Sequence, residues 1–237
     1  MLICKWEELP ESMQVSEVRR YYDLLKEKKI SLLCKRLFDI VLSVMLLIVF
    51  SPLFLVLAIA IKTDSPGPVF YRQTRVTQYG KLFKIHKFRS MVNDADKKGS
   101  LVTVAADMRV TKVGKIIRKY RLDEISQLLD VLSGNMTFVG TRPEVSRYVD
   151  EYTEEMRATL LMPAGITSLA SIFYKDEADL LDGAENPDEV YVKKILPEKM
   201  MWNLKGIEKF SFISDIKIMV MTVLAVLGKD YEREEMK

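Results

Sequence analysis

The segment Ile40–Ile61, IVLSVMLLIVFSPLFLVLAIAI, says more about the architecture of this protein than any other. It contains 22 residues and no charged side chain. At ~1.5 Å of rise per residue, about 20 apolar residues cross a bilayer as an α-helix. Because the run is too long and too uniformly apolar for a buried core helix, it predicts a helix embedded in a membrane.

Ser51 and Pro52 interrupt the middle of this stretch. Proline lacks the N–H that would bond to the carbonyl of Ile48, and it disfavours helix at the residue before it. That carbonyl then needs another donor, such as the Ser51 hydroxyl, other protein groups or interfacial water. Basic residues flank both ends, and such residues favour the cytoplasmic side of a membrane. The pattern favours a segment that bends at Ser51-Pro52 and leaves on the side it entered, with a spanning helix, straight or kinked, as the alternative.

Charge is distributed unevenly along the 237 residues. Residues 62–121 contain 15 Lys or Arg and 4 Asp or Glu, a balance of +11, so the remainder of this +3 chain carries −8. A basic block beside a membrane segment indicates anionic partners, either lipid headgroups or phosphorylated substrates. We find no nucleic-acid-binding motif, so we expect no nucleic-acid partner. The sequence has no Walker or G-x-G-x-x-G loop, so we expect no nucleotide binding by such loops.

Hydrophobic periodicity predicts the elements around the membrane segment. An amphipathic helix is expected over 14–28, and strands over 69–75 and 82–90 are expected to form a hairpin around a turn at 78–80. Residues 111–132 are helical in pattern but interrupted at 121–124, where Asp123 is suited to cap a second helix. We expect turns at 140–143 and 163–165, an acidic loop-rich region over 174–199, and an apolar helix over 216–227 that is too short to span.

Asp123 and Glu124 are the sharpest candidates for chemistry. Adjacent carboxylates at a helix start beside basic residues could hold Mg²⁺, which prefers oxygen ligands, or one of them could act as a nucleophile. The alternative is that they only cap a helix, since acidic residues are common there. The candidate phosphate binders are basic: Lys87, Arg89, Arg118 and Arg142. Each of these alone could equally be a solvated surface charge, although the Gly140–Pro143 turn fixes how Arg142 is presented.

Several motifs occur in one order along the chain. They are Lys35-Arg-Leu-Phe-Asp39, Ser51-Pro52, Ser65-Pro-Gly-Pro-Val-Phe70, Lys87-Phe-Arg-Ser-Met91, Asp107-Met-Arg-Val-Thr-Lys-Val-Gly114, Arg121-Leu-Asp-Glu124, Gly140-Thr-Arg-Pro143 and Pro163-Ala-Gly-Ile-Thr167. From about residue 34 to residue 228, this ordered set resembles the monotopic phosphoglycosyl transferases. These form the bacterial sugar transferase family, which includes the undecaprenyl-phosphate sugar phosphotransferases.

The resemblance implies roles for particular residues. It places an aspartyl nucleophile on Asp123, with Glu124 beside it and Mg²⁺ held by both, and it places Arg118 and Arg142 near the phosphates. Lys87 and Arg89 fall in a matching motif. The chain departs from the family pattern twice: Thr141 stands where proline is usual, which loosens the Arg142 turn, and Ser168 stands where glycine usually follows Ile-Thr.

The expected fold class is α+β and mostly helical. It is that of a monotopic membrane protein with a re-entrant helix, a small β-hairpin and interfacial amphipathic helices. The expected division is an N-terminal helical extension over 1–33, a re-entrant membrane helix over 34–62, a cytoplasmic catalytic domain over 63–206, and a C-terminal interfacial helix and tail over 207–237.

The implied activity is phosphoglycosyl transfer. Asp123 would attack a UDP-sugar, releasing UMP, and a polyprenyl (undecaprenyl) phosphate would then accept the sugar phosphate, initiating a surface glycan. We expect the enzyme at the cytoplasmic face of the bacterial inner membrane, in contact with membrane lipids, and leave a homodimer open. The rival hypotheses are a non-catalytic protein that binds anionic lipids and a glycosyltransferase that releases UDP.

Overall fold

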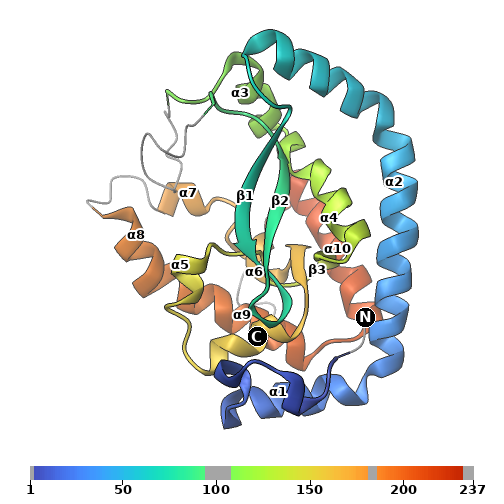
Figure 1. Ribbon diagram of the computed structural model, residues 1–237, viewed down its shortest axis with the longest axis vertical. Helices are drawn as coiled ribbons and strands as arrows, with labels where there is room; N and C mark the ends of the chain where they lie inside the picture. Colours follow the sequence, from blue (N-terminus) through green and yellow to red (C-terminus); the bar gives the residue numbers. More distant parts are fainter. Residues whose placement is uncertain (1–2, 94–107, 181–185, 232–237) are drawn as a thin grey trace.

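The computed structural model describes residues 3–93, 108–180 and 186–231. This part of the chain is mostly helical and contains two separate two-stranded sheets. Its longest element is α2, Lys29–Asp64, which includes the whole apolar stretch. Figure 1 shows α2 rising along one edge of the molecule and then bending over its top. The mostly helical α+β class with a hairpin is thus confirmed, and α2 begins a few residues before the expected boundary at 34.

Pro52 lies inside α2, which continues through it as helix. The Ser51 hydroxyl donates to the carbonyl of Ile48 at 2.8 Å, so it satisfies the acceptor that the proline leaves without its helical donor. Only 11% of the most apolar 18-residue part of α2 is buried inside the protein. The side chains of Ile48 and Leu55 are 69% and 63% exposed. A core helix would be covered, so this helix has the length, composition and exposure of a membrane-embedded one.

The Lys35–Asp39 motif fastens the first half of α2 to the rest of the protein. The buried Lys35 ammonium donates to the Val139 carbonyl at 2.7 Å and pairs with Asp215 at 2.6 Å. The Asp39 carboxylate accepts from the Thr137 hydroxyl at 2.7 Å. Because an unpaired buried charge is costly, these contacts fix how α2 sits against the strand at 136–139.

The amphipathic helix predicted near the N-terminus is present. After two short 3₁₀ turns, η1 (Trp6–Glu8) and η2 (Glu11–Met13), the helix α1 (Ser16–Glu27) buries Val18, Tyr22 and Leu25 on one face. This face joins a hydrophobic cluster with residues near 160 and near 207. The extension therefore packs along the catalytic part of the chain.

The predicted hairpin is present. Strands β1 (Phe70–Val76) and β2 (Leu82–Phe88) pair antiparallel, with Tyr71 opposite Lys87, around the short turn η3 (Gln78–Gly80). The two expected helices follow: α3 (Lys112–Lys119) is capped by Thr111, and α4 (Leu128–Ser133) ends at Gly134 in the left-handed conformation.

Between α3 and α4 the chain forms a 3₁₀ segment, η5 (Leu122–Gln127), and here one prediction was wrong. Asp123 does not cap a helix, because Arg121 occupies the N-cap position and no side chain makes a capping hydrogen bond. Arg121 adopts a left-handed φ of 51°, which is uncommon for a residue with a β-carbon. The backbone changes direction at Arg121, and the Asp123 carboxylate, which caps no helix, remains available for other contacts.

A small parallel sheet was not predicted. Strands β3 (Met136–Val139) and β4 (Ala164–Thr167) pair in parallel, so residues 163–165 run into a strand rather than forming only a turn. Both strands are short and almost completely buried, so their sequences lack the alternation of apolar and polar residues that indicates a half-buried strand. The Gly140–Pro143 turn directly follows β3.

The remaining described residues are mostly helical, including those of 174–180 and 186–199, a region that the sequence predicts to be loop-rich. The elements are α5 (Ser146–Val149), η6 (Glu155–Leu161), α6 (Leu169–Phe173), α7 (Glu177–Leu180), α8 (Pro187–Val190), the π-helix η7 (Tyr191–Ile195), α9 (Leu196–Glu208) and α10 (Phe212–Val226). The expected boundary at 206/207 falls inside α9. The predicted apolar C-terminal helix corresponds to α10.

Candidate active site

Glu124 is the centre of the candidate site. Its carboxylate accepts from both terminal nitrogens of Arg142, with Nη1 at 3.3 Å from Oε2 and Nη2 bonded to Oε1. The Lys87 ammonium lies 3.5 Å from the same Oε1. Three segments far apart in the sequence therefore meet here: β2, η5 and the turn after β3. The structure brings together Glu124, Lys87 and Arg142, three of the candidate site residues named from the sequence.

The two cations determine the charge state of Glu124. Burial alone would raise the pKa of Glu124, but Arg142 and Lys87 outweigh it and hold that pKa well below its usual range. Glu124 in turn raises the pKa of Arg142. A bidentate guanidinium–carboxylate pair in a partly buried site has a defined geometry, so Glu124 fixes where Arg142 points.

Asp123 lies in a different environment, although it is the next residue. Burial raises its pKa, while Lys87 and Arg118 act in the opposite direction. Within the described residues, no other side chain hydrogen-bonds to its carboxylate. Adjacent carboxylates with pKa values pushed apart by their surroundings fit different roles. Among the described residues, the Asp123 carboxylate accepts only from its own backbone N–H, so no other side chain blocks its use as a nucleophile or a metal ligand. Both oxygens of Glu124, by contrast, already bind Arg142.

Arg118 and Arg121 extend the positive surroundings of the carboxylates. Arg118, in the last turn of α3, is close enough to lower the pKa of Asp123. Arg121 lowers the pKa of Glu124, and its guanidinium donates to the carbonyl of Lys175 at 2.8 Å. The Asp107–Gly114 motif that precedes them begins outside the described residues.

Arg89 is not brought to this cluster. It is 4% exposed and donates to the carbonyls of Pro66 and Ser65 at 2.9 and 2.7 Å, and to the Ser65 hydroxyl at 3.0 Å. Its contacts hold the turn that follows α2. The side chain of Lys87 reaches the carboxylates, whereas that of Arg89 closes the end of the membrane helix.

His86 pairs with a buried aspartate rather than with a nucleophile. Its Nδ1 lies 2.8 Å from Asp130 Oδ1, and Ser126 donates to its backbone carbonyl rather than to its ring. A Ser–His–Asp triad would need the serine hydroxyl at the imidazole. The described residues therefore contain no such triad at His86.

The donor set fits Mg²⁺. Two adjacent carboxylates are typical protein ligands of this ion, which takes its remaining oxygens from water and substrate phosphates. Within the described residues, no cluster of three or more acidic, histidine or cysteine side chains could form a complete metal cage. The Asp123 carboxylate, to which no other described side chain hydrogen-bonds, is the better ligand of the two, because Glu124 already carries two cations.

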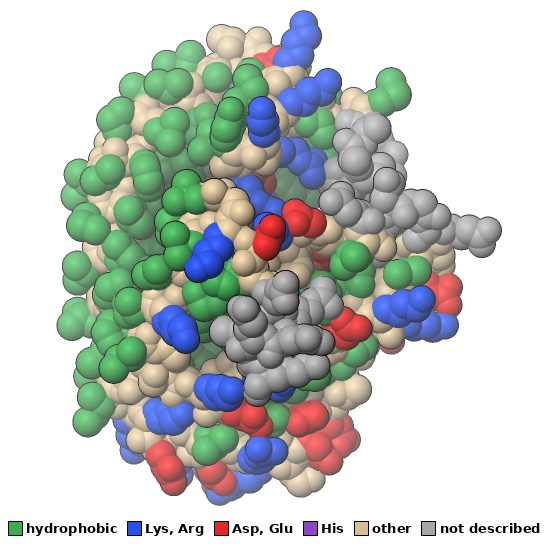
Figure 2. Space-filling view, turned by 180° about the vertical axis from the view of Figure 1, so that it is seen from behind, with side chains coloured by type: hydrophobic (Ala, Val, Ile, Leu, Met, Phe, Trp, Pro, Cys, Tyr) green, Lys and Arg blue, Asp and Glu red, His purple; other side chains and the backbone are tan. Residues whose placement is uncertain are grey.

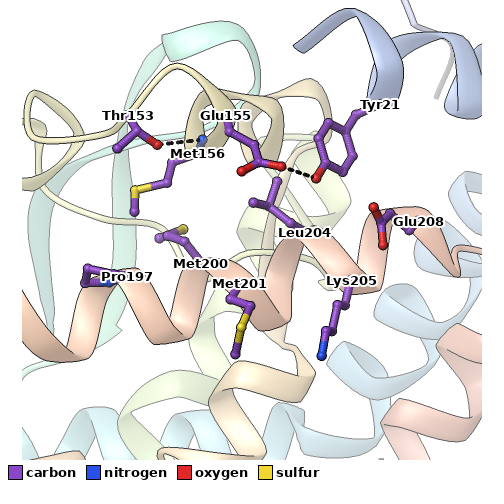
Figure 3. A pocket seen from close by; sticks show the side chains of 10 residues that line it. All are labelled: Tyr21, Thr153, Glu155, Met156, Pro197, Met200, Met201, Leu204, Lys205 and Glu208. Carbon is purple, nitrogen blue, oxygen red and sulfur yellow. Dashed lines mark hydrogen bonds between the residues drawn. The ribbon is translucent and has the colours of Figure 1, made fainter. Parts of the chain in front are cut away.

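One hollow in the described part of the chain lies away from these carboxylates. It has a volume of about 270 Å³ and is formed by α1, η6 and α9. Figure 3 shows Tyr21 donating to Glu155, with Met200 and Leu204 of α9 among the other side chains that line the hollow. None of the candidate catalytic residues lines it. Figure 2 shows the molecule from the opposite side to Figure 1. Hydrophobic side chains cover the edge formed by α2, and acidic and basic side chains lie together near the middle of the face in view.

Sequence reasoning missed two residues next to the site. Arg75 donates to the carbonyl of Pro143 at 3.2 Å, and Glu144 follows that proline as a 6% exposed carboxylate. Glu144 directly follows the Gly140–Pro143 motif, so its position in the sequence could have indicated that it lies near the site. Its burial depends on distant helices, which no local pattern reveals.

Known proteins resemble most of this chain. A family model described as bacterial sugar transferase matches residues 30–229. A UDP-N-acetylgalactosamine-undecaprenyl-phosphate N-acetylgalactosaminephosphotransferase of Aeromonas hydrophila is 35% identical over 196 residues, which cover 81% of this chain and 43% of the relative. A UDP-glucose:undecaprenyl-phosphate glucose-1-phosphate transferase of Escherichia coli K12 is 38% identical over 198 residues, which cover 81% and 39%.

A third relative is matched over nearly its full length. The exopolysaccharide production protein PSS of Rhizobium leguminosarum bv. phaseoli is 35% identical over 205 residues, which cover 84% of this chain and 97% of the relative. The chain spans less than half of the first two relatives. The resemblance drawn from the ordered motifs is confirmed, and this chain belongs to the bacterial sugar transferase family.

Proposed function

We propose that this protein transfers a sugar-1-phosphate from a UDP-sugar to a polyprenyl phosphate, with Asp123 as the nucleophile. The observation that carries the proposal is the carboxylate pair. In the described part of the chain, no other side chain hydrogen-bonds to the Asp123 carboxylate, which lies beside cationic groups, while Glu124 orients Arg142 and Lys87. Two relatives are named as transferases of sugar phosphates to undecaprenyl phosphate, which supports this substrate class.

The proposed reaction has two displacements at one phosphorus atom. An Asp123 oxygen attacks the β-phosphorus of the UDP-sugar, the bond to the bridging oxygen breaks, and UMP leaves. An oxygen of the polyprenyl phosphate then attacks the same phosphorus, the bond to Asp123 breaks, and the carboxylate is regenerated. Covalent catalysis divides a difficult transfer between two large substrates into two steps.

The basic residues have a direct role in both steps. Phosphoryl transfer spreads negative charge over the phosphate oxygens, and preorganised cations stabilise it. Arg142 and Lys87 are held in place by Glu124, and Arg118 lies beside Asp123. Mg²⁺ bound by Asp123 and Glu124 would supply further charge neutralisation at the diphosphate.

We place this reaction at the cytoplasmic face of the membrane, with α2 re-entrant and in contact with lipids. The exposed apolar surface of α2 and the basic residues flanking it support this topology. The Asp64 carboxylate, at the end of α2, accepts from the backbone N–H of Val113 at 2.9 Å. The membrane helix is thus attached directly to α3, which leads to the nucleophile, and this attachment supports a site close to the membrane surface, where the lipid phosphate lies. The product would start a surface glycan.

The test is Asp123→Asn, with Asp150→Asn at an exposed position as its control. Asp123→Asn should reduce UMP release by more than roughly a thousandfold, because it removes the nucleophile. Mass spectrometry should show a phosphosugar adduct on the wild type and on Asp150→Asn, but none on Asp123→Asn. Near-normal UMP release by Asp123→Asn would refute the mechanism, and release of UDP instead of UMP would favour an ordinary glycosyltransferase.

A further inference from the structure

A buried ionic cluster lies behind the turn that presents Arg142. Its centre is the Glu144 carboxylate, whose Oε1 accepts from the Tyr191 hydroxyl at 2.6 Å. The Lys199 ammonium is 3.8 Å from the same oxygen and 3.1 Å from the Tyr191 hydroxyl. The Arg75 guanidinium lies 3.9 Å from Oε2. We call Glu144, Tyr191, Lys199 and Arg75 the Glu144 cluster.

The cluster is attached to the Arg142 turn by the backbone. Arg75 donates to the carbonyl of Pro143 at 3.2 Å, and the backbone N–H of Val76 donates to the carbonyl of Glu144 at 2.9 Å. On the other side of the turn, the N–H of Gly165 donates to the carbonyl of Thr141 at 2.8 Å. These bonds hold the backbone on both sides of Arg142.

Stability alone is a weak reason for such a cluster. Glu144, Tyr191 and Lys199 are 6%, 3% and 5% exposed, and replacing buried ion pairs by apolar side chains of similar size is often neutral or stabilising. The local chain offers a different reason. Thr141 does not fix its φ angle as a proline would, so the geometry of the turn depends on the bonds that hold it.

We propose that Tyr191 and Glu144 are positioning residues that hold Arg142 where it binds the phosphate of the UDP-sugar. Tyr191 lies in the π-helix η7, and π-helical turns are frequent at functional sites. Through its hydroxyl, the helical region 187–208 is connected to the turn after β3. This inference rests on the proposed role of Arg142 in phosphate binding and assigns a purpose to a helical region that contributes no catalytic residue.

Tyr191→Phe tests the inference with little change in volume, and Tyr148→Phe is a matched control. Tyr148 is 5% exposed, stacks on Tyr191 with ring centroids 4.7 Å apart, and donates its own hydroxyl to Asp188 at 2.6 Å. Tyr191→Phe should raise the KM for the UDP-sugar and lower kcat/KM for UMP release about tenfold, equivalent to ~1.4 kcal/mol. Tyr148→Phe should change kcat/KM by less than about twofold, while its change in Tm should be similar to that of Tyr191→Phe.

A double-mutant cycle shows whether Tyr191 acts through Arg142. In an Arg142→Ala background, Tyr191→Phe should have no further effect on kcat/KM, because the side chain that it positions is gone. Additive losses in the double variant, or a loss in Tyr148→Phe as large as in Tyr191→Phe, would overturn the inference.

The cycle separates this inference from the proposed function. If the Asp123 adduct forms and Asp123→Asn is inactive but the cycle is additive, the mechanism stands and the positioning role fails. If Asp123→Asn still releases UMP, the proposed function fails whatever the cycle shows.

Discussion

Arg142 has enough donors for two partners. A guanidinium offers five N–H groups in a plane, and Glu124 engages one on each terminal nitrogen. The remaining donors are available to a phosphate, and the side chain is 35% exposed. Glu124 therefore need not be displaced by the substrate. It holds one edge of the Arg142 guanidinium, while the N–H groups on another edge bind the phosphate.

Arg142→Ala should lower kcat/KM for UMP release by about a hundredfold or more, as loss of one preorganised charge donor does in other sites. Lys119→Ala is the control, since Lys119 is an exposed lysine at the end of α3. It should stay within about twofold of the wild type. Steady-state kinetics with both variants measures the difference, and equal losses would favour a diffuse role of positive charge.

The acid limb of the pH profile should depend on Lys87. Asp123 must be ionised to attack, so activity falls as the pH drops through its pKa, which burial raises and Lys87 lowers. Lys87→Met removes a lowering charge, so the pKa of Asp123 rises further and the acid limb of kcat/KM moves to higher pH.

Lys84→Met is the control for this shift, because Lys84 is exposed on the same strand. Its acid limb should coincide with that of the wild type. A shift of the Lys87→Met profile to lower pH, or no shift, would contradict the electrostatic account of the site.

At the scale of elements, the Gly140 turn and β4 approach too closely for a side chain. A β-carbon at Gly165 would lie 2.2 Å from both the backbone nitrogen and the backbone oxygen of Gly140. Gly165→Ala should therefore separate β4 from the turn that carries Arg142, and it should destabilise the protein by roughly 2–4 kcal/mol. Thermal unfolding and UMP release measure the two effects.

Gly206→Ala provides the comparison. Gly206 lies in α9, and a β-carbon there would meet nothing within 4 Å. The substitution should be neutral or stabilise by up to about 1 kcal/mol, since alanine is the better helix former. A Gly165→Ala protein as stable as Gly206→Ala would show that β3 and β4 are not held as tightly as described.

The sequence predicted those elements whose signal is local. The apolar run of α2, the buried stripe of α1 and the turn of the β1–β2 hairpin each follow from nearby residues. The parallel pair β3–β4 could not be predicted, because its partners are about 28 positions apart and both strands are buried on every side. The same limit applies to the site: the Asp123–Glu124 pair was visible, whereas the separate environments of Asp123 and Glu124 depend on Lys87 and Arg142.

At the scale of the whole molecule, α2 and α10 share an apolar character that the rest of the described chain lacks. Ile48 and Leu55 on α2 and Val223 on α10 are 69%, 63% and 59% exposed. Large apolar surfaces are rarely left in water, so both helices are expected to contact lipid. The polar anchors Lys35 and Asp39 bind the first half of α2 to the catalytic part, which leaves the second half to determine the topology.

The last prediction concerns that topology. If α2 is re-entrant, cysteines introduced at Ile30 and Thr63 in a Cys4- and Cys34-free protein should both be protected from an impermeant thiol reagent in intact cells, and both should react after lysis. Ser51→Ala with Pro52→Ala restores the missing N–H and removes an obstacle of ~3 kcal/mol to continuous straight helix. The segment is long enough to span once straight, so part of the population should then expose one end, with reduced UMP release. The flanking charges oppose translocation, so Pro52→Ala alone should shift the population less. Labelling of the Ile30 position in intact wild-type cells would refute the re-entrant arrangement.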